Sequence, residues 1–188
     1  MASTLPTERF DVKPGTLFVG VDLALDRHVV VVLDGQRKRL DRFGFANTRE
    51  GFDFFHQRVT GLCQRCRAPG VLIGMEPTNS FWKPLAAEME RRSQPYCLVN
   101  PYTVKKHREG DQLDRSRDDN RDARKIAELV CIGTYTKTIL LHGTYAELRE
   151  YVTMYHRLRK DLTRQKAVIW SLVGQVFPEL TMVFPDLS

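Results

Sequence analysis

The chain has 188 residues, of which 42% are hydrophobic and 28% are charged, proportions that fit a folded globular protein and argue against disorder. No run approaches the roughly 20 apolar residues of a membrane span, and the opening residues lack the apolar core of a signal peptide, so we expect a cytoplasmic protein without membrane contacts and with a flexible tail over residues 1–15. The net charge of +6 and the crowding of lysines and arginines in residues 105–125 and 149–166 favour a polyanionic partner.

The first part of the chain is predicted to form three antiparallel strands. Residues 17–25 and 28–33 are rich in β-branched side chains and are separated by a short polar turn, and residues 37–46 mix apolar and polar side chains. Asn47 or Thr48 is a suitable N-cap for a helix that follows, in which apolar residues recur at helical spacing.

Short strands and helices alternate in the next part of the chain. Residues 71–75 form a wholly apolar run of the kind found in buried parallel strands, and residues 96–99 predict a fifth strand. Between these strands, Ser80 can cap a helix that runs to about Arg92. The order of elements predicts an α/β fold with a mixed five-stranded sheet in the order 3-2-1-4-5, flanked by helices.

Two further helical segments, near residues 104–108 and from about Asp118, complete a domain that we expect to span residues 16–140. Residues 144–176 then read as one long helix in which apolar side chains recur at spacings of three and four. Such a stripe is typical of a helix that packs against a partner helix. We therefore expect residues 141–188 to be a coiled-coil segment that forms a homo-oligomer.

Four acidic residues fall at related places in this predicted fold. Asp22 lies in an apolar strand, where a buried unpaired charge would cost several kcal/mol, and Glu76 ends the fourth strand beside it. A helix packed across the sheet can bring Asp119 and Asp122, which are three residues apart and share a helix face, to the same point.

Carboxylates that converge in this way repel each other unless divalent cations lie between them. Oxygen ligands without histidine or cysteine at comparable spacing favour Mg²⁺ or Mn²⁺ over zinc, and two such ions can support phosphodiester chemistry. Structural explanations stay open at this stage. Asp22 can start a turn, Glu76 can simply end a strand, and the acids near Asp118 can cap a helix.

Four segments of the chain share their order and spacing with a known family: GVDLALDRH from residue 20, GMEPTNSFW from residue 74, VNPYTVKKHREG from residue 99 and DDNRDARKIAEL from residue 118. They resemble the N-terminal RuvC-like (RNase H-like) domain of the DEDD transposases, the bridge-RNA-guided serine recombinases of bacterial insertion sequences related to the pilin-gene invertase. The resemblance covers about residues 18–129, and the long helix beyond looks like the coiled-coil segment of the family.

The resemblance implies a catalytic, metal-binding set of four acids that hold Mg²⁺ or Mn²⁺, and DNA and a guide RNA as partners. Carried over residue by residue, the acids are Asp22, Glu76, Asp119 and Asp122. With these acids around a phosphate, we expect basic side chains such as Lys105, Lys106, Arg121 and Arg124 to bind the RNA or DNA backbone. The extra acid at Asp118 leaves the third ligand open between Asp118 and Asp119, of which Asp119 keeps the three-residue interval. Asn79 stands where the family commonly has glycine.

The nucleophilic serine of this family lies in a separate C-terminal domain, which the sequence ending at Ser188 does not contain. The resemblance therefore implies half of a DNA recombinase that does not recombine DNA alone. A non-catalytic module for nucleic-acid binding and dimerisation is the alternative. A sugar kinase or actin-like ATPase also begins with an aspartate in a strand, but the glycines of this chain are scattered rather than grouped into phosphate-binding loops.

Overall fold

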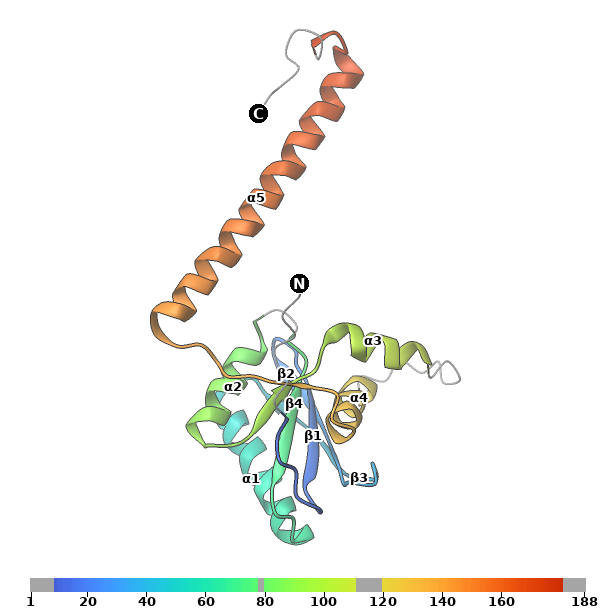
Figure 1. The fold of residues 1–188 in the computed structure, drawn as a ribbon, viewed down its shortest axis with the longest axis vertical. Coiled ribbons are helices and arrows are strands. Elements are labelled where there is room, and N and C mark those ends of the chain that lie inside the picture. Colours follow the sequence, from blue (N-terminus) through green and yellow to red (C-terminus); the bar gives the residue numbers. More distant parts are fainter. Residues whose placement is uncertain (1–8, 78–79, 111–119, 181–188) are drawn as a thin grey trace. The chain divides into compact units, whose positions relative to one another are not determined.

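The computed structural model describes residues 9–77, 80–110 and 120–180. The chain divides into two compact units, Met1–Leu140 and Leu141–Ser188. The first unit is an α/β domain and the second contains one long helix, and each is drawn in Figure 1.

The α/β domain is built on a six-stranded mixed sheet with the order β3-β2-β1-β4-β5-β6. The strands are β1 (Leu17–Asp22), β2 (Arg27–Leu33), β3 (Arg39–Ala46), β4 (Val71–Met75), β5 (Tyr96–Leu98) and β6 (Thr136–Lys137). β1 to β3 form an antiparallel meander, β4 and β5 continue the sheet in parallel with β1, and β6 is antiparallel to β5. The predicted strand order 3-2-1-4-5 is confirmed, with β6 as an added strand.

Helices cover both faces of this sheet. The helices of the domain are α1 (Arg49–Cys66), α2 (Trp82–Arg91), α3 (Pro101–Gly110) and α4 (Asn120–Cys131). Apolar side chains of α1 and α2, such as Phe55 and Leu85, pack with one face of the strands, while α3 and α4 supply Val104 and Ile126 to a separate core on the other face. The arrangement is a three-layer sandwich (Figure 1).

The predicted helix starts are confirmed in one case and wrong in another. Thr48 is the N-cap of α1, where its Oγ1 accepts a hydrogen bond from the Gly51 N–H at 3.2 Å. Ser80 does not cap α2, because the residue before that helix is Phe81 and no side chain caps it. The Lys83 N–H donates instead to the backbone carbonyl of Ser80 at 3.1 Å, so the chain enters α2 through a backbone turn.

The second unit contains α5 (Gly143–Val176), a helix of 34 residues with no buried side chain. Leu148, Tyr151, Tyr155, Leu158, Leu162, Ile169, Leu172 and Val176 are all more than half exposed and repeat at intervals of three, four or seven residues. The predicted long helix over residues 144–176 is therefore present, and its apolar stripe faces solvent. Within the described residues no helix is both long and apolar enough to cross a membrane.

Candidate functional site

Asp22 and Glu76 lie next to each other at the carboxyl end of the sheet. β1 and β4 are parallel neighbours whose last paired positions are Val21 and Met75, and each acid is the residue that follows. Adjacent strands are about 4.8 Å apart, so the two backbone positions are as close as a sheet allows. Both side chains are partly buried. Because the ends of parallel strands are where α/β sheets present functional groups, these two acids form the centre of the candidate site.

Helix α4 lies unusually close to this part of the sheet. A Cβ atom at Gly20 would lie only 2.0 Å from the backbone oxygen of Ala123, and one at Gly74 would lie 2.2 Å from the Val130 side chain. Gly20 and Gly74 are paired across β1 and β4, so two neighbouring glycines make room for the helix. Only residues without a side chain permit this approach.

The contacts at the C-terminal end of α4 show in which direction the helix runs. Its last residue, Cys131, contacts the carbonyl oxygens of Asp34 and Gly35 in the β2–β3 turn, which lies at the end of the sheet away from Asp22. The N-terminus of α4 therefore points toward the carboxylate end, and it carries Asp122 immediately before Ala123, the residue that touches Gly20. A helix N-terminus has partial positive charge and favours anions.

The other predicted acids and the metal geometry are less complete. Asp119 and Asp118 fall outside the described residues. Asp22, Glu76 and Asp122 each take part in a polar or electrostatic interaction. No group of three histidine, cysteine or acidic side chains within the described part of the chain is arranged to hold a metal ion. The donors that are present are oxygen atoms of neighbouring carboxylates, which are the ligand type that Mg²⁺ and Mn²⁺ prefer.

The predicted basic contacts lie on α3 and α4. Lys105 and Lys106 are exposed on α3, and the side chain of Arg121 is outside the described residues. Arg124 forms an ion pair with Glu128 at 2.8 Å, and Lys125 approaches the same carboxylate at 3.0 Å. Burial favours the neutral acid at Glu128, yet these hydrogen bonds hold its pKa below the ordinary value. The positive charge of Arg124 is thus partly neutralised by Glu128, which leaves less of it to attract a phosphate group.

His28 is a buried polar residue whose importance the sequence analysis missed. It lies at the start of β2 with no exposed surface, its Nδ1 accepts a hydrogen bond from the Ala24 N–H at 3.2 Å, and its ring packs edge-on against Phe45. Burial lowers the pKa of His28, against an opposing contribution from Asn47. The residue therefore anchors the turn that follows Asp22. The sequence feature that could have indicated this role is a histidine six residues after that aspartate, in GVDLALDRH.

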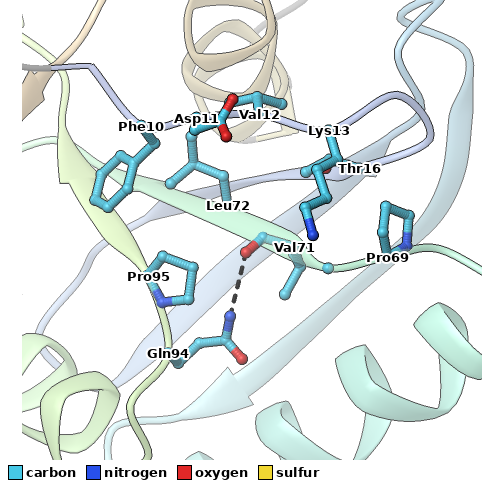
Figure 2. A pocket seen from close by; sticks show the side chains of 11 residues that line it. Phe10, Asp11, Val12, Lys13, Thr16, Pro69, Val71, Leu72, Gln94 and Pro95 are labelled. Carbon is cyan, nitrogen blue, oxygen red and sulfur yellow. Dashed lines mark hydrogen bonds between the residues drawn. The ribbon is translucent and has the colours of Figure 1, made fainter.

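A cavity of about 300 Å³ lies at the opposite end of the sheet and contains none of the predicted site residues (Figure 2). It is bordered by the segment before β1, the α1–β4 connection and the α2–β5 connection. The Gln94 side chain closes part of it by donating a hydrogen bond to the Val71 carbonyl at 3.2 Å. The candidate site is therefore the carboxylate end of the sheet and not this cavity.

A family model for DEDD transposases, described as "Transposase", matches residues 19–178, which is most of the chain. The chain belongs to the DEDD transposase family. No curated protein matches it. Among solved structures, it is similar to one titled "T. thermophilus RuvC in complex with Holliday junction substrate", with 15% sequence identity and a TM-score of 0.43; the match covers 65% of this chain and 99% of that chain.

The range matched by the transposase model has a structural meaning. It contains all four predicted acids and extends through α5, which ends at Val176. The long helix is thus part of the region that defines this transposase family, together with the α/β domain that carries Asp22 and Glu76.

Proposed function

We propose that this transposase chain is the metal-binding, nucleic-acid-contacting half of a DNA recombinase, with Asp22, Glu76, Asp119 and Asp122 as its ligands for Mg²⁺ or Mn²⁺. The observation that carries the proposal is that Asp22 ends β1 and Glu76 directly follows the neighbouring parallel strand β4, at the end of the sheet toward which the N-terminus of α4 points. Membership of the transposase family supports the same assignment.

The ion, when bound, would supply positive charge that stabilises a phosphodiester during cleavage or exchange. Of the proposed ligands, Asp22, Glu76 and Asp122 would hold that charge from positions within or directly beside regular elements. Asp22 and Glu76 directly follow Val21 and Met75, the last pair of the β1–β4 ladder. Asp122 is fixed by the packing of Ala123 against Gly20.

The proposed partners are DNA and a guide RNA, in the cytoplasm. Lys105 and Lys106 are exposed on α3, whose first turn is capped by the Asn100 side chain accepting from the Tyr102 N–H at 2.9 Å. Tyr102 is 72% exposed and presents an aromatic ring beside these lysines, a combination that suits a nucleic-acid strand. Strand exchange itself would require the serine domain of the family.

A calorimetric titration with MnCl₂ tests the metal site. The parent chain should bind Mn²⁺, and Asp22→Asn and Glu76→Gln should each abolish or strongly weaken binding because each removes a ligand charge. Asp161→Asn is the matched control, since Asp161 is an exposed acid on α5 and loses the same charge. Equal heats from the parent, both site variants and the control would rule out a shared metal site.

The second candidate function is a non-catalytic module that binds nucleic acid and dimerises, and the exposed stripe of α5 favours it. The stripe runs along a helix about 50 Å long, enough for several turns of contact with a second copy. Leu158→Asp places a charge in the stripe, and Ala167→Asp places the same charge outside it. Light scattering should show a smaller mass for the first variant alone, while equal masses would remove α5 from the assembly.

A further inference from the structure

The edge of the sheet at β3 has one covered face and one open face. On the covered face, Phe43 and Phe45 pack against Phe55 of α1. On the other face, Ala123 and Ala127 of α4 pack with Val31 and Leu33 of β2. α4 thus lies over β1 and β2, and β3 is the next strand outward on that face of the sheet.

Arginines occupy the open face of β3. Arg42 pairs with Val31 and Arg39 with Leu33, and both of these partners point toward α4, so the arginines lie on the α4 side of the sheet. A register shift between Val32 and Leu33 keeps Arg39 on that side despite the odd spacing from Arg42. Both arginine side chains are exposed.

Arg27 extends this row toward the candidate site. A Cβ atom at Gly44 would lie 2.8 Å from the Arg27 Nε and 3.3 Å from its Nη2, so the guanidinium group occupies the space above the glycine. Its Nη2 also donates to the Gly44 carbonyl at 3.5 Å, a long contact. Gly44 is two residues from Arg42 on β3, and Arg27 is therefore the third member of the row.

The positive charge of the row is not compensated by the acids nearby. Asp34 accepts hydrogen bonds from the Gln36 and Lys38 N–H groups at 2.9 Å and so orders the turn. Asp41 forms an ion pair with Arg58 of α1 at 2.8 Å, on the covered face. The structure records no ion pair between Arg27, Arg39 or Arg42 and any described acid.

The row also has a direction. Arg27 lies near the carboxylate end of the sheet, because Asp22 pairs with Val29 two residues further along β2. Arg39 lies opposite Leu33 at the other end of β2, about 20 Å away along the strand. Beyond it, the exposed Arg37 and Lys38 continue the positive surface into the β2–β3 turn.

We propose that the row of Arg27, Arg42 and Arg39 binds the sugar–phosphate backbone of a nucleic-acid strand and leads that strand along β3 to the carboxylates. The inference rests on the proposed function for its end point, the phosphodiester at Asp22 and Glu76. Guanidinium groups suit this role because they bind phosphate through two parallel hydrogen bonds and stay charged at all relevant pH values. The net charge of +6 agrees with a polyanionic ligand.

A matched pair of double variants tests the proposal. Arg39→Gln/Arg42→Gln removes two charges from the row, and Arg65→Gln/Arg67→Gln removes two exposed charges near the end of α1, whose apolar face packs on the other side of the sheet. Fluorescence anisotropy with mixed-sequence single-stranded DNA, single-stranded RNA and duplex DNA measures the dissociation constants over a series of salt concentrations. The three probes distinguish which backbone the row prefers.

The salt dependence gives the expected size of the effect. Each lost phosphate contact should lower the slope of log affinity against log salt by about 0.7 for single strands or 0.9 for duplex, which corresponds to about five- to eightfold weaker binding at 0.1 M salt. The row variant should therefore bind at least one probe about 25- to 60-fold more weakly. The control variant should stay within a few-fold of the parent and keep its slope.

The test of the arginine row can be distinguished from the test of the metal site. The row variant should bind Mn²⁺ like the parent while it loses affinity for nucleic acid, and Asp161→Asn, which changes an exposed acid on α5, should leave both kinds of binding unchanged. Row and control variants that weaken binding equally would show a general charge effect and overturn the proposal. It would also be overturned if the parent bound none of the three probes, or if Arg27→Gln and the row variant both bound them all like the parent.

Discussion

The close seating of α4 on the sheet predicts that Gly20→Ala destabilises the protein strongly. The added methyl group would lie 2.0 Å from the Ala123 backbone oxygen and 2.4 Å from the Ala127 backbone nitrogen. An ordinary carbon–oxygen contact is about 3.3–3.6 Å, so the helix must retreat by more than about 1 Å, because no flexible side chain can yield instead. The face that it would lift contains Ala123, Ile126 and Ala127, all fully buried.

Overpacking of a core typically costs about 1–3 kcal/mol, and a clash with backbone atoms belongs at the upper end of that range. We therefore expect Gly20→Ala to lower the free energy of unfolding by about 3 kcal/mol, a large part of the 5–15 kcal/mol typical of a domain. Urea denaturation followed by circular dichroism measures this, and with a slope of about 2 kcal/mol per M the midpoint should fall by about 1.5 M.

Gly61→Ala provides the control for this prediction. Gly61 lies within α1, and the nearest atom to an added Cβ is the flexible end of Arg65 at 4.0 Å. Alanine is a better helix former than glycine, so this variant should be more stable than the parent by about 0.5–1 kcal/mol. The reasoning about α4 would be refuted if Gly20→Ala had the same midpoint as the parent, or if both variants shifted it in the same direction.

Two further predictions concern the effect of pH on stability. Burial lowers the pKa of His28, so just below the ordinary value of 6.5 only the unfolded chain takes up a proton. The free energy of unfolding should therefore fall as the pH decreases through that value. His28→Phe should remove this step in urea titrations at a series of pH values. Hydrogen bonds from Arg91 and Arg92 lower the pKa of Glu88 to about 2, against the effect of burial. The contribution of Glu88 to the free energy of unfolding is therefore present above pH 4.5 and is lost as the pH falls toward 2. A Glu88→Gln variant that kept the parent's full loss of stability in this pH range would contradict the assignment.

The sequence was sufficient for those elements that follow from local patterns. The apolar runs around Val19, Val31 and Ile73 identify buried strands, since a continuous apolar stretch of that length has few other uses in a folded domain. The strand order then made Asp22 and Glu76 neighbours, because a crossover helix returns the chain beside the first strand. β6 could not be found in this way, since Thr136 and Lys137 are both exposed and carry no apolar pattern.

Features that depend on pairing between distant segments were beyond the sequence. Gly20 and Gly74 are unremarkable until the register places them side by side under α4. Likewise, Arg39 and Arg42 are an odd number of residues apart, and only the register shift in β2–β3 puts them on one face. The predicted cap at Ser80 is wrong for a related reason. The Lys83 N–H donates to the backbone carbonyl of Ser80, and no side chain caps α2.

The absence of buried side chains from α5 has a consequence for how the protein responds to dilution. A helix that buries none of its side chains depends mainly on its own backbone hydrogen bonds, whereas most helices in proteins are stabilised by packing of an apolar face. If α5 pairs with a second copy, mass action makes its melting temperature rise with protein concentration, whereas the sheet domain, with its own core, should melt at a temperature that does not change. Two thermal transitions that separate as the sample is diluted would be the calorimetric signature of this division.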